Sequence, residues 1–139
     1  MFFAGESGKD AGSMTAKYNV VERGNPADPE APKKYYPSYV STGKVRLRDM
    51  AERIAEISTM STIDTMGMLE AFLQVIPEYL AEGKIVDLGE FGSFRLKIKS
   101  KGSERAEEVS EENIERVLPQ FRAGKEFRKK IREIEFERA

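Results

Sequence analysis

The stretch GEFGSFRLKIKSKG, residues 89–102, opens with a glycine-containing turn and continues as a strand in which apolar residues and cations alternate. The apolar residues are Phe94, Leu96 and Ile98, and the cations are Arg95, Lys97 and Lys99. Because successive side chains of a strand point to opposite faces, one face is expected to be entirely positive. Cations on alternate positions lie about 7 Å apart, close to the phosphate spacing along one DNA strand. The pattern therefore favours a polyanionic partner.

The composition excludes several kinds of site. The chain has 139 residues and a formal net charge of -1, and 40% of its residues are hydrophobic and 34% charged. These values are typical of one globular domain with a highly charged surface. The chain has no cysteine and no histidine, which excludes disulfides, thiolate chemistry, typical zinc sites and histidine-activated nucleophiles. We expect no enzyme activity, no cofactor and no metal site.

The first residues do not resemble a targeting segment. MFFAGESGKDAGSM lacks the basic start and the apolar core of a signal peptide. Residues 1–16 are therefore interpreted as a flexible leader or a cloning scar, with Met14 as the natural start. No apolar run approaches the roughly 20 residues that span a bilayer. The sequence predicts a cytoplasmic protein with no membrane partner.

Two amphipathic helices are predicted in the middle of the chain. Apolar residues recur at helical spacing over residues 47–57 and again over residues 63–80. Ser61 is a suitable N-cap for the second helix, Gly83 is a suitable residue to end it, and Pro77 should kink its last turns. The apolar stripe of the pair is wider than two helices can bury on each other, which predicts a further packing partner.

The remaining segments alternate as strands or lack periodicity. Strands are expected at residues 17–23, 84–88, 114–121 and 132–138, and a short helix at residues 125–134. The proline-containing residues 24–34 and the tyrosine-rich residues 35–43 are interpreted as loops. Because helices and strands are segregated along the chain, the pattern predicts an α+β fold with an antiparallel sheet. The first and last strands are expected to pair or to extend the sheet, since each would otherwise be an unpaired edge.

Positive charge is concentrated in two segments. Residues 95–101 contain four cations and no acid, and residues 122–132 contain six cations against Glu126 alone. Six glutamates lie within residues 104–115, which we interpret as a solvated charge run. In a chain of near-neutral net charge, this asymmetry is typical of a protein that binds a polyanion.

From Lys44 to about Ile134 the chain resembles the HU/integration-host-factor family of bacterial histone-like DNA-binding proteins. The resemblance rests on RLRDMAERIAE (46–56), MLEAFLQVIPEYLAEGKIVDLGEFGSFRL (68–96) and FRAGKEFRKKI (121–131). The separation of the last two blocks fits the two-stranded arm of that family. Residues 17–43 resemble the extension of a longer subgroup common in Bacteroidetes-type bacteria. Residues 44–139 are accordingly expected to form the HU-like DNA-binding domain.

The resemblance implies an intertwined homodimer with a helical base, an antiparallel β-saddle and two-stranded arms. It implies an aromatic dimer core made of Phe72, Phe91, Phe94 and Phe121. It implies DNA contacts by Lys44, Arg95, Lys97, Lys99, Lys101, Arg122, Lys125, Arg128 and Lys129. The implied function is largely sequence-neutral binding of double-stranded DNA through its phosphates, in packaging of the nucleoid, with no small-molecule substrate.

The expected arm departs from the family at its tip. The family tip typically carries an Arg-Asn-Pro element whose proline wedges between base pairs, which bends the duplex. Here SKGSERAEEVSEEN, residues 100–113, is acidic and has neither proline nor a large apolar side chain. We therefore expect weak bending of DNA. The alternative function is a protein-interaction module on the same scaffold, whose acidic arm repels DNA and engages a basic partner.

Overall fold

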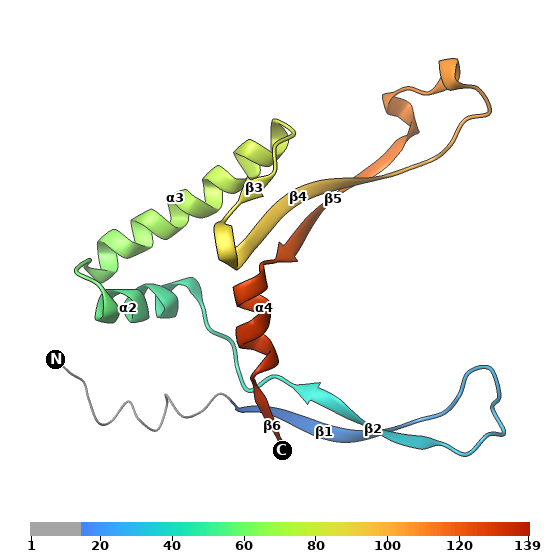
Figure 1. Cartoon of the computed structure of the whole chain (residues 1–139), viewed down its shortest axis with the longest axis horizontal. Coiled ribbons are helices and arrows are strands. Elements are labelled where there is room, and N and C mark those ends of the chain that lie inside the picture. The colour runs from blue at the N-terminus through green and yellow to red at the C-terminus, as the bar shows by residue number, and fades with distance from the viewer. Residues whose placement is uncertain (1–14) are drawn as a thin grey trace. The chain divides into compact units, whose positions relative to one another are not determined.

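A computed structural model describes residues 15–139 (Figure 1). The described chain forms two compact units, where length alone predicts one domain. Unit 1 consists of residues 15–44 together with residues 131–139, and unit 2 consists of residues 45–130. The expected leader, residues 1–16, lies outside the described residues up to residue 14, whereas Thr15 and Ala16 belong to the first strand.

Unit 1 is a three-stranded sheet made of β1 (Thr15–Arg23), β2 (Lys34–Val40) and β6 (Glu135–Arg138). The central strand β1 is antiparallel to β2 and parallel to β6. The side chains of Lys17 and Glu137 form an ion pair between β1 and β6. The prediction that the short strands at the two ends of the chain pair with each other is confirmed.

The interpretation of residues 35–43 as an irregular loop is wrong, because Lys34–Val40 forms β2. Pro37 has no backbone N–H to donate, which argues against a central strand. However, β2 lies at the edge of its sheet, where proline is tolerated. Residues 24–33 form the loop between β1 and β2, as their three prolines predict.

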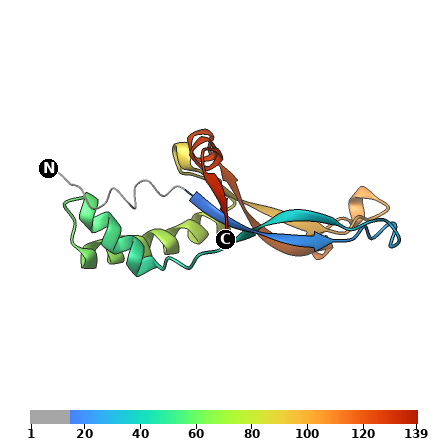
Figure 2. The same ribbon diagram turned by 90° about the horizontal axis from the view of Figure 1, so that it is seen from below.

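Unit 2 begins with a helical hairpin of α2 (Leu47–Ile57) and α3 (Thr62–Ala81), which lie side by side (Figures 1 and 2). The N-cap is confirmed, because Ser61 Oγ accepts a hydrogen bond from a backbone N–H in the first turn of α3 (3.1 Å). Gly83 follows the end of α3 with a φ of 84°, the left-handed conformation that favours glycine. No helix within residues 15–139 is long and apolar enough to cross a membrane.

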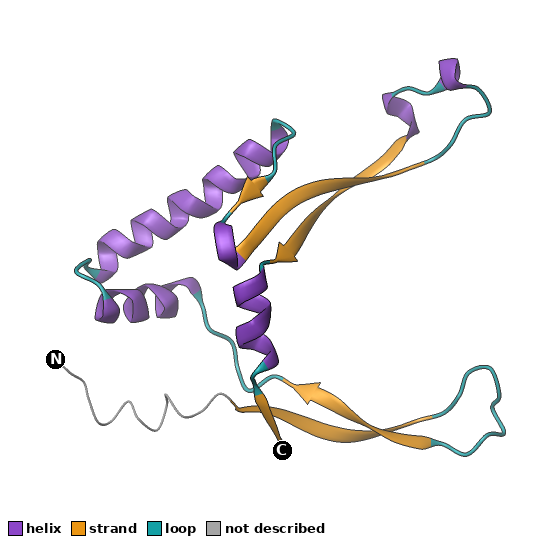
Figure 3. Ribbon diagram, viewed as in Figure 1, coloured by secondary structure: helices purple, strands orange, loops and turns teal. Residues whose placement is uncertain are grey.

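A second, antiparallel sheet completes unit 2 in the order β3-β4-β5 (Figure 3). Its strands are β3 (Val86–Asp87), β4 (Gly92–Ser100) and β5 (Ile114–Ala123). β4 and β5 extend together as a two-stranded arm whose tip contains two short 3₁₀ turns. α4 (Lys125–Arg132) follows β5, and its last two residues belong to unit 1. The predicted α+β class with an antiparallel sheet is confirmed.

Few side chains are buried within a single chain. Among the described residues, Ala51 and Leu80 are the only apolar side chains that are buried. α3 instead exposes a broad apolar stripe that includes Ile63, Met68, Phe72, Leu73, Val75 and Tyr79. This stripe confirms that the helical hairpin carries more apolar surface than its two helices bury on each other.

The backbone of Gly124 lies against the turn that precedes β4. Its N–H donates to the Phe91 carbonyl (2.8 Å), and a Cβ at this position would lie 2.1 Å from the Glu90 carbonyl oxygen. Gly124→Ala should therefore destabilise the fold by about 2 kcal/mol or more, within the upper range for single substitutions. Chemical denaturation at fixed protein concentration measures the change.

Gly67→Ala is the matched control for this prediction. Gly67 lies inside α3, and a Cβ there would meet no atom within 4 Å. Removing a glycine from a helix interior should stabilise the protein by up to about 1 kcal/mol. Equal stability of the two variants would contradict the close approach at Gly124.

Candidate nucleic-acid interface

The register between β4 and β5 collects cations on one face of the arm. Directly opposite residues of an antiparallel pair share a face of the sheet. By this register, one face, hereafter the basic face, carries Arg95, Lys97 and Lys99 of β4 with Arg116 and Arg122 of β5. No carboxylate lies on this face along the described residues 93–99 and their partners in β5. The face is therefore positive over its whole length.

Arg116 is a member of the basic face that sequence reasoning missed. It lies opposite Lys99 in the sheet. The available signal was the alternation of β5 read backwards from Arg122, which places residues 122, 120, 118 and 116 on one side. That signal is weak, because residues 120 and 118 are Gln and Leu and do not continue the charge pattern.

The opposite face of the arm is apolar and leads into an aromatic cluster. Phe94 lies opposite Phe121 with ring centroids 4.9 Å apart, and the centroid of Phe91 is 5.2 Å from that of Phe121. Phe127 of α4 meets Phe91 edge-on at 4.9 Å. Three of the four predicted core aromatics therefore lie together with Phe127, whereas Phe72 joins none of these ring contacts in the described chain.

A depression of about 410 Å³ at the base of the arm brings four cations together. Its lining includes Arg95 and Arg122 of the sheet and Lys125 and Arg128 of α4. Arg95 Nη2 donates to Ser93 Oγ (3.0 Å), whereas its buried Nε has no partner among the described residues. The one carboxylate of the lining, Asp87, accepts a hydrogen bond from the backbone N–H of Gly89 (2.9 Å). The depression can therefore accept a negatively charged group.

The cations of the basic face are not neutralised within residues 15–139. The cations that form ion pairs are others: Lys17, Arg48, Arg53, Lys84, Lys101 and Arg105. An unpaired guanidinium or ammonium group retains its full capacity for charge-assisted hydrogen bonds to an anion. The arrangement therefore suits phosphate groups.

The other predicted contact residues do not belong to the basic face as the register of β4 and β5 defines it. Lys101 follows the end of β4, and its Nζ lies 3.9 Å from a Glu115 carboxylate oxygen. Lys129 is exposed on α4. Lys44 precedes α2 by three residues and belongs to unit 1, whereas the basic face belongs to unit 2.

Asn113 holds the tip of the arm in a defined loop. Its Nδ2 donates to the Lys101 carbonyl and to Ser103 Oγ, both at 2.9 Å, and its Oδ1 accepts from the Ser110 N–H at 2.9 Å. Val109 is exposed, so the acidic tip also carries an apolar side chain of moderate size. Among the described residues, no three His, Cys, Asp or Glu side chains are placed to hold a metal ion.

A helical hairpin followed by an antiparallel arm with one basic face defines an HU-like α+β protein. The family model HU-HIG, an HU domain fused to a wHTH, Ig or glycine-rich motif, matches residues 14–138. The chain belongs to this family. The resemblance to HU and integration host factor proteins is thereby confirmed.

Individual relatives cover most of the HU-like part. The integration host factor subunit alpha of Acinetobacter baylyi is 33% identical over 86 residues, covering 60% of this chain and 88% of that protein. The same subunit of a Marinomonas species is 29% identical over 91 residues, covering 64% of this chain and 93% of its own.

A solved structure shares the fold. The crystal structure of a candidate bacterial DNA-binding protein from Bacteroides vulgatus superposes with a TM-score of 0.63 at 13% sequence identity. The match covers 89% of this chain and 47% of the other, so the present chain spans about half the length of that protein. At this level of identity, the similarity shows the fold alone.

Proposed function

We propose that the protein binds double-stranded DNA as a non-enzymatic, histone-like homodimer that packages the nucleoid in the cytoplasm. The observation that carries this proposal is the basic face, with five cations, no carboxylate and no internal ion pair within the described residues. Alternate positions of a strand lie about 7 Å apart, and each phosphate that a cation neutralises releases counterions. The relatives named integration host factor subunit alpha support the proposal.

The binding is expected to be largely neutral to sequence. Contacts between cations and phosphates orient a protein on DNA without reading bases. Gln120 is the only amide side chain on the described basic face that could contact a base edge bidentately. The depression beside Arg95 would anchor one phosphate, because Arg95 and Arg122 of the sheet line it together with Lys125 and Arg128 of α4.

We assign DNA binding to the segment 44–139, and within it to unit 2. The end of that segment, residues 131–139, packs with the extension 17–43 in unit 1. Among the described residues of unit 1, no face carries a comparable run of cations, because the face with Lys17, Arg23 and Lys34 also carries Glu135 and Glu137. The extension is therefore proposed to serve another role than phosphate contact.

The exposed apolar surface of unit 2 supports the homodimer. The stripe on α3 and the half-exposed rings of Phe91 and Phe121 have no cover within the described chain. Removing apolar surface from water contributes roughly 25 cal/mol per Å². Because most soluble homo-oligomers are two-fold dimers, a second copy is the expected cover. We place Phe72 and the aromatic cluster in this interface.

Light scattering at micromolar concentration should report about twice the chain mass of 15.7 kDa. Phe72→Glu should shift the mass toward that of one chain, because it introduces a charge into the proposed apolar interface. Gln74→Glu, which adds the same charge at an exposed polar position two residues away, should leave the dimer intact. A monomeric wild-type protein would contradict the dimer.

DNA affinity should depend on the cations of the basic face. Each lost phosphate contact reduces the slope of log affinity against log salt by about 0.9. Replacing Arg95, Lys97 and Lys99 with alanine should therefore weaken binding to all duplexes alike and flatten the slope by up to about 2.7 per protomer. Titrations of labelled duplex at several salt concentrations measure both effects.

The matched control removes three cations that already have ion-pair partners. Arg48, Arg53 and Lys84 lie next to Glu52, Glu56 and Glu82 in unit 2. Replacing these three with alanine changes the net charge equally but should leave the salt slope within one unit of wild type. If both triple variants bind alike, the basic face is not the contact surface, and the protein-interaction module becomes the better function.

Bending of DNA should be weak. The tip lacks a proline wedge, and its glutamates would meet phosphates as like charges. Replacing Glu107, Glu108, Glu111 and Glu112 with glutamine should change affinity less than about twofold if contact is confined to the base of the arm. Fluorescence transfer across an end-labelled duplex measures the bend. A sharp bend like that of proline-armed relatives, or a large gain in affinity, would show that the arm reaches the duplex.

A further inference from the structure

The sheet of unit 1 has one aromatic face and one charged face. Tyr18 and Val20 of β1 lie opposite Tyr39 and Pro37 of β2, and Phe136 of β6 lies beside Ala16. The other face carries the ion pair of Lys17 with Glu137, the polar residues Asn19 and Ser38, and Arg23, whose guanidinium carbon is 5.9 Å from the Tyr36 ring centroid. The first face is thus mostly apolar, and the second is mostly polar or charged.

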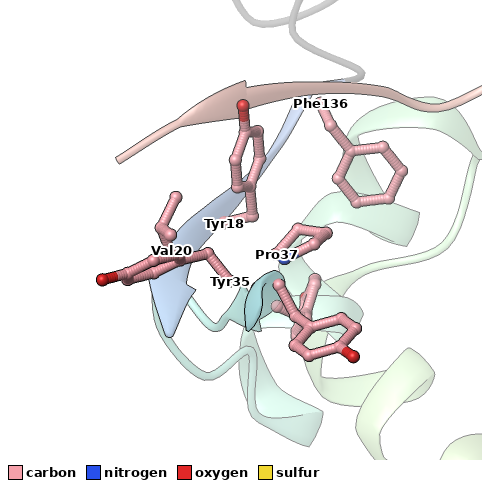
Figure 4. Close-up of a pocket in the computed structure, with 7 residues that line it drawn as sticks. Tyr18, Val20, Tyr35, Pro37 and Phe136 are labelled. Atoms are coloured by element: carbon pink, nitrogen blue, oxygen red, sulfur yellow. The ribbon is translucent and has the colours of Figure 1, made fainter. Parts of the chain in front are cut away.

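The aromatic face is open. Tyr35, Tyr39 and Phe136 are 69%, 72% and 61% exposed, and they surround a cavity of about 650 Å³ together with Tyr18, Val20 and Pro37. Figure 4 shows the side chains of Tyr18, Val20, Tyr35, Pro37 and Phe136 gathered at this cavity. Within unit 1, the strands contact mainly one another, with β1 packed between β2 and β6. An antiparallel sheet with one apolar face normally packs that face against a second layer.

The charged residues on the aromatic face restrict which kind of molecule can pack against it. Alternation along the strands places two charged residues on it, Glu22 beside Tyr35 and Arg138 beside Tyr18. Tyrosines on a sheet can stack nucleobases, but such sites combine stacking with a positively charged groove. One cation balanced by one anion makes no such groove. The face is therefore better suited to another apolar protein surface.

We propose that the aromatic face of unit 1 packs against the same face of a second copy of this chain. Arg138, level with Tyr18, and Glu22 lie on either side of Val20 along the face, about 13 Å apart along β1. A two-fold axis that runs across the strands brings the Glu22 end of one copy to the Arg138 end of the other. In this arrangement the apolar side chains of the two copies face each other, and each Glu22 faces the Arg138 of the other copy.

The size of the face decides how this contact forms. The three strands, of nine, seven and four residues, cover roughly 300 Å² per copy, well below the roughly 800 Å² per partner of a stable interface. The contact therefore rests on the homodimer proposed for unit 2, which holds the second copy nearby at an effective concentration in the millimolar range. It forms a second, smaller interface within that dimer.

Cysteine cross-linking tests the proposal, because the chain contains no cysteine of its own. Val20→Cys places a thiol on the aromatic face, and Asn19→Cys places one on the charged face of the same strand. Two packed sheets lie about 10 Å apart, which a short bis-maleimide spans. In the full-length dimer, Val20→Cys should cross-link between chains at least about tenfold faster than Asn19→Cys. Reaction with a monofunctional maleimide in denaturant checks that both thiols are present and reactive.

The outcomes separate this inference from the proposed homodimer. Light scattering on each variant comes first, and a monomer there refutes the homodimer and, with it, the packing of the two faces. If the variants are dimeric and the two thiols cross-link at equal rates, only the present inference fails. Protection of the Val20→Cys thiol by a single-stranded oligonucleotide, without cross-linking in its absence, would assign the face to nucleobases instead. Tyr39→Lys in the Val20→Cys chain should abolish the cross-link while the dimer mass remains.

Discussion

The pairing register of β4 with β5 is the constraint on which the rest of unit 2 depends. Phe94 lies opposite Phe121, and the sides of residues 92–99 of β4 and 116–123 of β5 follow from that pair, up to the register shift between Lys99 and Ser100. A slip of one residue would move Arg95 into the aromatic cluster and turn the phenylalanines toward water. Phe127 and the close backbone approach at Gly124 hold this register at the base of the arm.

The same register explains how a chain with a net charge of -1 can present a basic surface. The cations lie along one face of the arm from its base to Lys99 and Arg116, and the glutamates are gathered around its tip. From Ser93 to Ser100 the strand extends about 23 Å, about three times the screening length in physiological salt. The tip therefore does little to cancel the field at the base, and net charge says little about the partner.

A second property of this protein is that few of its described side chains are buried within one chain. Each unit carries an apolar surface that its described residues leave open, the stripe of α3 in unit 2 and the aromatic face in unit 1. A chain that exposes apolar surfaces of this extent gains stability by association, because association buries apolar area that a single chain leaves in water. Fold and assembly are thus expected to be coupled, and the measured stability should depend on protein concentration.

The sequence by itself determined the elements whose signals are local. The 3.6-residue periodicity, the Ser61 cap and the Gly83 end defined α3, and strict alternation defined β4 and both of its faces. Only the tertiary structure decided what depends on partners distant in the chain. β1 and β6 meet across more than 100 residues, Arg116 joins the basic face through its partner in β4, and Arg95 gains a depression shared with α4. β2 escaped prediction because Pro37 forbids a central strand but not an edge strand, and the edge position follows from the pairing order rather than from any local pattern.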